Sequence, residues 1–152
     1  MTGRLRIGKR FLLVVEDDAG WRNILKELLM EAGFQVRACA SFGDALGSLR
    51  REKFTLAVLD LSLSGTNNYG AADQGLDGYQ LLANVHHEGI ATIVVSGIAE
   101  PEEIERIYSE YSISAYIEKQ TFDRAMFRRA VEETRIANKS RDELGALTER
   151  ER

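Results

Sequence analysis

Four polar groups in the sequence directly follow apolar segments and are of types that could act together in one site. Asp60 interrupts the apolar stretch FTLAVLDLSLSG, which begins at Phe54. Three acids at residues 16–18 end the run RFLLVV, Ser96 ends ATIVV, and Lys119 ends SAYIE. Burying an unpaired charge is costly, so a carboxylate at the end of a buried strand implies a compensating partner or a function.

These residue types fit the chemistry of phosphoryl transfer. Carboxylates that lie close together repel each other and raise one another's pKa, and a hard divalent cation with oxygen ligands removes that repulsion. Magnesium suits a site with few carboxylates, water and a phosphoryl group. A carboxylate can also act as a nucleophile and form an aspartyl-phosphate, and a nearby ammonium and hydroxyl would hold the added oxygens.

The elements that must position these groups alternate along the chain. Apolar runs predict strands at residues 10–18, 34–39, 54–61, 91–97 and 114–119. Helical spacing and end signals predict helices at residues 19–33, 41–53, 77–89, 100–112 and 121–140. The end signals include Ser41 as an N-cap, Gly33 as a C-terminal stop and Pro101 in a first turn. Such an alternation predicts a parallel sheet with helices on both faces.

In folds of this class, ligands bind beyond the carboxyl ends of the strands. The polar groups that end four of the predicted strands should therefore meet at one edge of the sheet. The distribution of charge agrees with this expectation: residues 11–118 hold 7 basic and 17 acidic side chains, a net charge of −10 within a chain of net charge −4. Such an acidic body is a poor nucleic-acid surface and a suitable host for a cation.

Length and composition indicate an ordinary globular protein. The 152 residues suit one domain with a full core. No apolar run is long enough to span a bilayer, and the basic start MTGRLRIGKR runs into a predicted strand without a cleavage site, so we expect no membrane contact and a cytoplasmic location. Cys39 is the single cysteine, which excludes an internal disulfide, and we expect it to be a small strand residue.

With its motifs in this order, the sequence resembles the receiver domain of two-component response regulators. The resemblance covers residues 11–137 and rests on VVEDD, VLDLSLSG, VVSG and AYIEK. It implies a flavodoxin-like, doubly wound α/β fold with five parallel strands in the order 2-1-3-4-5. It also implies a signalling switch that is not an enzyme.

Carried over residue by residue, the resemblance makes Asp60 the phosphoacceptor. Asp17 and Asp18 match the metal-binding acids, with Asp60 as the third carboxylate, and the backbone carbonyl of Ser62 matches the remaining protein ligand. The implied cofactor is Mg²⁺.

Three further residues match the family's residues that respond to phosphorylation. Ser96 matches the hydroxyl that follows the phosphoryl group, Lys119 the lysine that pairs with it, and Tyr116 the aromatic switch residue. The implied partners are a histidine kinase or phosphotransfer protein and, after phosphorylation, a second copy of the chain. The surface expected to change comprises the fourth predicted helix, the fifth strand and the last helix.

The sequence departs from the family at two places. Gln120 stands where the family usually has a proline after a cis bond, and a cis bond before another residue costs roughly 3 kcal/mol, so we expect a trans bond here. The Asp-Gly pair expected eight residues beyond the phosphoacceptor matches Asp77 and Gly78, so the loop between residues 64 and 78 carries about ten extra residues. Loops tolerate such insertions at little cost.

The termini are expected to flank the domain as a basic leader, residues 1–10, and a helical tail or linker, residues 138–152. Two interpretations of the tail stay open. LTERER is similar to the opening of the helix-turn-helix domain of LuxR-type regulators, which would make the output transcription, and it equally fits an ordinary charged helix. A DNA-reading helix is not predicted, so we expect no specific nucleic-acid binding by this chain.

Two other function classes remain. One is an enzyme with an aspartyl nucleophile of the dehalogenase-like phosphatase type, but that family has a second Asp two residues after the nucleophile, where this sequence has Ser62. The other is a receiver-like module that binds a partner without phosphorylation. Nucleotide binding is disfavoured, because the turn after the first strand is EDDAG and lacks a glycine-rich phosphate loop.

Overall fold

The chain forms a five-stranded parallel sheet flanked by helices. The structure is a computed structural model that describes residues 11–62 and 76–150, with the main chain alone for residue 76 and residues 140–150. The strands are β1 (Phe11–Val15), β2 (Gln35–Cys39), β3 (Leu56–Leu59), β4 (Ala91–Ser96) and β5 (Ala115–Glu118). Their order is β2-β1-β3-β4-β5, and every neighbouring pair is parallel. The predicted fold and strand order are confirmed.

The helices in the described part of the chain are α2 (Ala19–Glu31), α3 (Phe42–Arg51), α4 (Leu76–His87), α5 (Pro101–Tyr111), the short 3-10 helix η2 (Lys119–Thr121) and α6 (Arg124–Arg150). The helices α2 and α3 begin after residues whose side chains accept hydrogen bonds from free backbone amides, and α5 begins with a proline. Asp18 caps α2 by accepting from the amide of Trp21, and Ser41 caps α3 by accepting from the amide of Asp44. Pro101 is the first residue of α5, where a missing amide is harmless.

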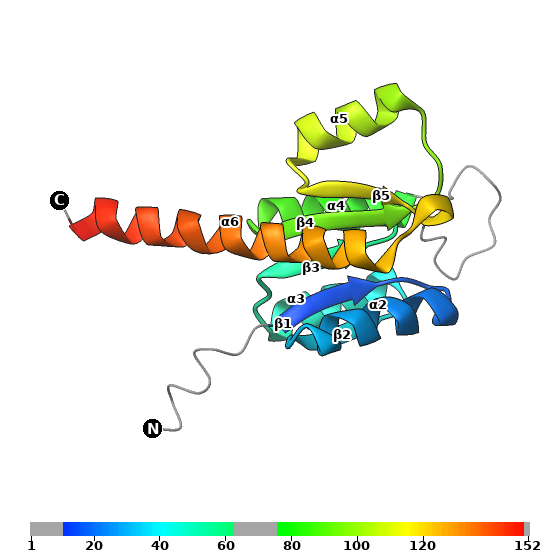
Figure 1. Ribbon diagram of the computed structural model, residues 1–152, viewed down its shortest axis with the longest axis horizontal. Coiled ribbons are helices and arrows are strands. Elements are labelled where there is room, and N and C mark those ends of the chain that lie inside the picture. Colours follow the sequence, from blue (N-terminus) through cyan, green and yellow to red (C-terminus); the bar gives the residue numbers. More distant parts are fainter. Residues whose placement is uncertain (1–10, 63–75, 151–152) are drawn as a thin grey trace.

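The last helix starts later and ends later than the sequence predicts. The 3-10 turn η2 occupies Lys119–Thr121, and the Asp123 carboxylate accepts a hydrogen bond from the Ala125 amide, which fixes the start of α6 at Arg124. The helix then continues past residue 140 to Arg150 without a break at the expected boundary between residues 137 and 138. Figure 1 shows its C-terminal half projecting beyond the sheet and the other helices.

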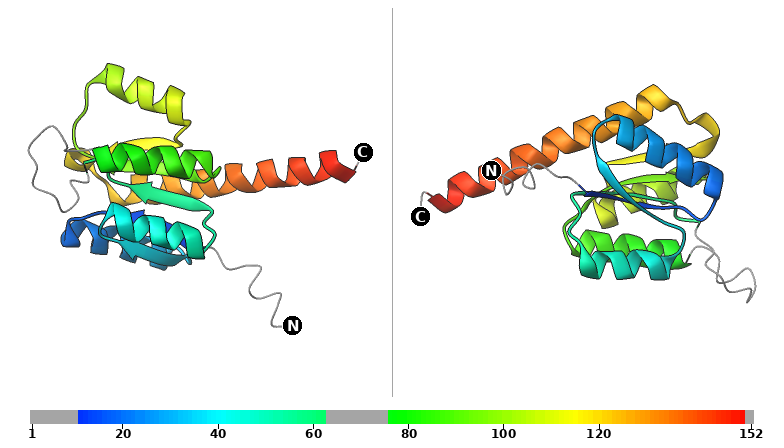
Figure 2. Two further views of the ribbon diagram at one scale, coloured as in Figure 1. Left: turned by 180° about the vertical axis from the view of Figure 1, so that it is seen from behind. Right: turned by 90° about the horizontal axis from the view of Figure 1, so that it is seen from below.

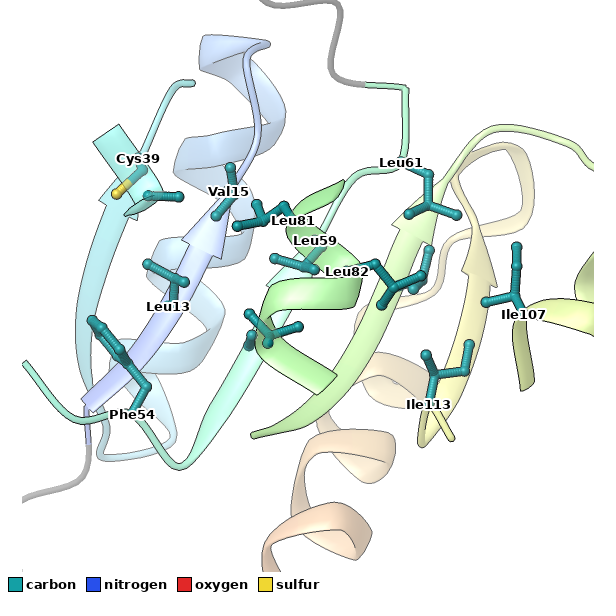
Figure 3. Packing of buried hydrophobic residues seen from close by; sticks show 14 residues of the cluster. Leu13, Val15, Cys39, Phe54, Leu59, Leu61, Leu81, Leu82, Ile107 and Ile113 are labelled. Atoms are coloured by element: carbon teal, nitrogen blue, oxygen red, sulfur yellow. The ribbon is translucent and has the colours of Figure 1, made fainter. Parts of the chain in front are cut away.

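The sheet separates two hydrophobic clusters. In the right-hand view of Figure 2, α2 and α6 lie on one side of the sheet and α3 and α4 on the other. Side chains of β1, β3 and β4 point alternately into each cluster, so Leu13 joins the α4 side and Leu12 joins the α2 side. Figure 3 shows the first cluster, where Leu81 and Leu82 of α4 pack over the sheet and Ile107 of α5 packs near its edge.

Burial on both faces explains the continuous apolar runs in the central strands. All four residues of β3 are buried, as are the last four of β1 and the last five of β4. Each fully buried Leu, Ile or Val contributes roughly 1.5–3 kcal/mol by leaving water. Cys39 lies in this core, as expected of a small strand residue.

The parallel strands place all their carboxyl ends at one edge of the sheet. Among the described residues, no helix combines the length and the hydropathy needed to cross a membrane. The insertion expected between residues 64 and 78 lies mostly outside the described residues. At this edge of the sheet lie the polar residues that follow β1, β3 and β5 and the serine that ends β4.

Candidate functional site

Asp60 lies directly after β3 and is held by three neighbouring residues. Its amide donates to the Val15 carbonyl at 3.1 Å, which continues the pairing of β3 with β1 by one residue. Its Oδ1 accepts hydrogen bonds from the Ser62 amide (2.9 Å), the Ser62 hydroxyl (2.7 Å) and the Ser96 hydroxyl (2.7 Å). Its Oδ2 accepts from Nζ of Lys119 at 2.8 Å. The residue is only 2% exposed, so these donors replace water around a buried carboxylate.

The electrostatic balance keeps Asp60 ionised. Burial by itself raises the pKa of this carboxyl group, but the hydrogen bonds from Lys119, Ser62 and Ser96 outweigh burial and bring the pKa below its ordinary value. An ionised carboxylate is the form that can act as a nucleophile. The sequence prediction of a charged, compensated Asp60 at this edge therefore agrees with the geometry.

Lys119 follows β5 and lies between two carboxylates. Its Nζ is 2.8 Å from Oδ2 of Asp60 and 2.8 Å from Oε1 of Glu16. Burial lowers the pKa of Lys119, but the two carboxylates raise it by more than burial lowers it. The net shift is therefore upward, and the ammonium stays charged. No peptide bond in the described residues is cis, which confirms the trans bond expected before Gln120. Lys119 reaches Asp60 from this ordinary backbone.

Three acids from two strand ends form a compact group. Carboxylate oxygens of Glu16, Asp17 and Asp60 all lie within 4.8 Å of one another. Asp18, which the sequence pairs with Asp17 as a metal-binding acid, is outside this group. Its Oδ1 accepts the Trp21 amide at 2.9 Å as the N-cap of α2. The structure thus brings Asp17 and Asp60 together as predicted and places Glu16 where Asp18 was expected.

Glu16 is the site residue that the sequence reasoning missed. Its side chain is fully buried at the end of β1, and burial raises its pKa to about 7. Oε2 accepts the Asp18 amide at 3.0 Å, and Nη1 of Arg22 donates to the Glu16 carbonyl at 2.9 Å. These contacts fix the turn between β1 and α2. A signal was present in the sequence, because a helix that starts at Ala19 needs Asp18 as its cap.

This group of acids fits a hard divalent cation. All the donors are carboxylate oxygens, which Mg²⁺ prefers. In addition, Oε1 of Glu16 is buried and receives no hydrogen bond of good geometry, although the Lys119 ammonium is nearby. Three carboxyl groups within 4.8 Å of one another carry the repulsion that a cation would relieve, and burial raises the pKa of one of them, Glu16. Whether the backbone carbonyl of Ser62 adds a ligand stays a prediction.

Ser96 and Tyr116 lie on neighbouring strands beside Asp60. Ser96 ends β4, is 3% exposed and donates its hydroxyl to Asp60, as the sequence predicted for this residue's position. Tyr116 in β5 is half-buried, and its hydroxyl donates to the carbonyl of Gly97 at 2.8 Å. Burial raises the pKa of Tyr116, so the phenol stays protonated and can donate. Asp60 is therefore in direct contact with Ser96, and Gly97, the next residue in the chain, is in contact with Tyr116.

Known proteins are similar to this chain in sequence and in fold. Residues 12–132 match the family model described as the response regulator receiver domain. The "Probable transcriptional regulator ycf27" of Porphyridium aerugineum is 35% identical over 66 residues, which are 43% of this chain and 28% of that protein. The "Transcriptional regulatory protein GltR" of Pseudomonas aeruginosa is 37% identical over 60 residues, 40% of this chain and 25% of that protein. The chain therefore spans about a quarter of the length of these relatives.

Solved structures share the fold at low sequence identity. A CheY-like response regulator receiver domain protein from Methanospirillum hungatei has a TM-score of 0.72 and 24% identity, covering 88% of this chain and 99% of that one. The signal receiver domain of a putative Luxo repressor protein from Vibrio parahaemolyticus has a TM-score of 0.74 and 16% identity, covering 90% and 97%. NtrX from Brucella abortus has a TM-score of 0.77 and 22% identity, covering 92% of this chain and 30% of that one.

The match to the family model covers residues of all five strands and every residue of the candidate site. It begins in β1, just before the acids, and ends in α6, beyond Lys119. The strand order and the grouping of Asp60 with Asp17, Lys119 and Ser96 agree with what the resemblance to this family implied, whereas Glu16 takes the place expected for Asp18. The chain belongs to the family of response regulator receiver domains.

Proposed function

We propose that this domain is a phosphorylation switch in which Asp60 accepts a phosphoryl group. One observation carries the proposal: the Asp60 carboxylate contacts Lys119 and Ser96 and shares a space of less than 5 Å with the carboxylates of Glu16 and Asp17. A structural ion pair would need Lys119 alone. The acids and the hydroxyl have an evident use if a phosphoryl group and a cation occupy the same edge of the sheet.

In the proposed reaction, a carboxylate oxygen of Asp60 forms a bond to the phosphorus of a phosphohistidine while the P–N bond breaks. The electron pair of the P–N bond stays on the imidazole nitrogen, which takes a proton from solvent, so that neutral imidazole leaves. The ammonium of Lys119 and the hydroxyl of Ser96, now bonded to the carboxylate, would transfer their hydrogen bonds to phosphoryl oxygens. The phosphohistidine donor would be a histidine kinase or phosphotransfer protein, as the family implies.

Glu16, Asp17 and Asp60 are the residues that would hold Mg²⁺. When bound, the ion would supply positive charge to the phosphoryl oxygens and would offset the repulsion among the acids. Asp17 is exposed, whereas Glu16 and Asp60 are buried. The open side of the site is therefore that of Asp17, from which water and donor would approach.

The output is proposed to leave the site through Ser96 and Tyr116. Movement of the Ser96 hydroxyl toward a phosphoryl group would alter the space near Gly97, whose carbonyl holds Tyr116. The surface biased by this change comprises α5, β5 and α6, and we propose that it forms a homodimer after phosphorylation. The regulators named among the relatives support a transcriptional output, which would act through a DNA-binding segment beyond residue 150.

Labelling with a small phosphodonor tests the proposal. The chain is incubated with acetyl phosphate and Mg²⁺, and its intact mass is measured. We expect a single added phosphoryl group that is lost with EDTA and in Asp60→Asn, which keeps the shape but removes the nucleophile. Asp44→Asn, an equal change of charge in the first turn of α3, is the matched control and should label like wild type. Equal labelling of Asp60→Asn and wild type would assign the phosphoryl group elsewhere.

Absence of labelling in every protein would favour the module that binds a partner without phosphorylation.

A further inference from the structure

The ring of Trp21 faces the ammonium of Lys119. Trp21 is the third residue of α2, and its ring centroid lies 5.3 Å from Nζ of Lys119. This distance is within the roughly 6 Å over which a cation is attracted to the face of an aromatic ring, and tryptophan is the strongest such partner. The ammonium thus has two carboxylates, those of Glu16 and Asp60, and one ring among its neighbours.

The ring itself is fixed from two directions. The backbone amide of Trp21 donates to the Asp18 carboxylate that caps α2, and this contact sets the position of the helix start. Its ring packs edge-on against Phe122, with centroids 5.1 Å apart and an interplanar angle of 83°. Phe122 in turn lies 5.5 Å from the ring of Phe127, which is fully buried in α6. The row Trp21, Phe122, Phe127 therefore joins α2 to the segment that follows Lys119.

A lysine at this place needs such a support. Its side chain is a flexible four-carbon stem, and the ammonium is a compact charge without directional preference. Lys119 is the first residue of η2 and is followed by an ordinary trans peptide bond and by Gln120. The side chain retains 19% exposure, so water competes for the ammonium on the open side. A ring over that ammonium shields it from water and restricts the directions that the stem can adopt.

We propose that Trp21 is a positioning residue for Lys119, holding the ammonium over Asp60 through a cation–π contact. The contact is a property of the fold and stands independently of the reaction. Its consequence for the rate rests on the proposed function, because only a phosphoryl acceptor at Asp60 would use the position of the ammonium. In the alternative, the ring only packs against Phe122, and Lys119 lies beside it by coincidence.

A double-mutant cycle tests the contact without any phosphodonor. Trp21→Leu, Lys119→Met and the double variant are unfolded in urea beside wild type. Leu keeps apolar bulk against Phe122 but has no ring face. We expect the unfolding equilibrium constants to show a coupling of about three- to tenfold between the two sites. Coupling below twofold would overturn the proposal, since packing on Phe122 is the same with either residue at position 119.

Phosphorylation rates then test the positioning role. With acetyl phosphate, Trp21→Phe should label within about twofold of wild type, because it retains a ring face, whereas Trp21→Leu should label about three- to tenfold more slowly. The Mg²⁺ concentration at half-maximal rate should be the same in all three proteins, which a general loosening of the site would not give. Equal rates for the Leu and Phe variants would overturn the role of the ring in positioning.

The two measurements separate this inference from the proposed function. If wild type takes up no phosphoryl group but the cycle shows coupling, the proposed function fails and the Trp21–Lys119 contact is supported. If wild type labels and the cycle shows no coupling, the proposed function stands and the positioning role is overturned.

Discussion

Gly78 in α4 lies against the main chain of Leu61, so closely that a β-carbon at residue 78 would sit 2.2 Å from the Leu61 carbonyl oxygen. Leu61 stands between Asp60 and Ser62, which bond to each other at the site. The start of α4 is therefore in direct contact with the turn that shapes the phosphoacceptor. No side chain larger than hydrogen fits between them, and this explains the glycine of the Asp77–Gly78 pair.

The first prediction follows from this contact. Gly78→Ala should displace the Leu61 turn and lower the free energy of unfolding by about 2–3 kcal/mol, since the clash is with backbone and cannot be relieved by a rotamer. Labelling of Asp60 should slow as well. Gly43→Ala is the matched control, because a β-carbon there meets nothing within 4 Å. Urea denaturation measures the stability of both variants, and equal stability would contradict the close approach.

The second prediction separates the two acids after Glu16. Asp17→Asn should weaken Mg²⁺ binding at least tenfold, because it removes a charged ligand from the group of three carboxylates. Asp18→Asn should leave the Mg²⁺ affinity within about twofold, because Asn still caps α2, whereas Asp18→Ala should cost about 1 kcal/mol of stability. Calorimetric titration with MgCl₂ measures the affinities. A loss of affinity in Asp18→Asn would restore Asp18 as a metal-binding acid.

The third prediction concerns pH. Since burial raises the pKa of Glu16 from 4.5 to about 7, the unfolded chain releases this proton at lower pH than the folded one. The metal-free domain should therefore lose stability as pH rises from about 4.5 to about 7, on the order of 3 kcal/mol from this group. The lowered pKa of Asp60 acts below this window and the raised pKa of Lys119 above it.

Replacing Glu16 by Gln isolates that contribution. Glu16→Gln should remove this part of the pH dependence and should make the metal-free domain more stable than wild type at pH 7.5. The comparison is made by urea denaturation in EDTA at several pH values. Parallel pH profiles for the two proteins would show that Glu16 titrates normally.

The fourth prediction concerns the route out of the site. Beryllofluoride, a phosphoryl mimic, should change the amide exchange of residues 97–120 and increase self-association of wild type in sedimentation. Ser96→Ala removes the hydroxyl that bonds to Oδ1 of Asp60, so it should weaken both responses while still binding the mimic. Identical exchange and sedimentation with and without the mimic in wild type would exclude this route.

Much of the fold could be predicted because its signals are local. Each central strand is buried on both faces and reads as a continuous apolar run, and Ser41 and Pro101 mark helix starts by their own chemistry. Parallel strands then force their carboxyl ends to one edge. The meeting of Asp60, Ser96 and Lys119 follows from that rule, although the residues are far apart in the chain.

What the sequence left undecided depends on register and on tertiary contact. Residues 16–18 are all acids, and a shift of one residue exchanges a buried carboxylate for a helix cap, so Glu16 and Asp18 can be separated only where the start of α2 is known to the residue. The Trp21–Lys119 and Gly78–Leu61 contacts join different segments and leave no local pattern. The length of α6 was also underestimated, because its distal half contains charged residues that fit a helix or a linker equally well.

The part of α6 that projects beyond the sheet (Figure 1) is a lever arm. The helix is held to the body by Phe127 and Val131 in the core and by Asn138, whose side-chain amide donates to the Thr55 carbonyl at 3.1 Å. Beyond Asn138 it continues to Arg150, which at 1.5 Å per residue is a lever arm of about 18 Å. A tilt of about 10° at the fulcrum would carry its tip through about 3 Å, a displacement comparable to a hydrogen-bond length. Because Arg124 lies about 21 Å from Asn138 on the other side of this fulcrum, a displacement at the start of α6 would reach residue 150 at about its full size.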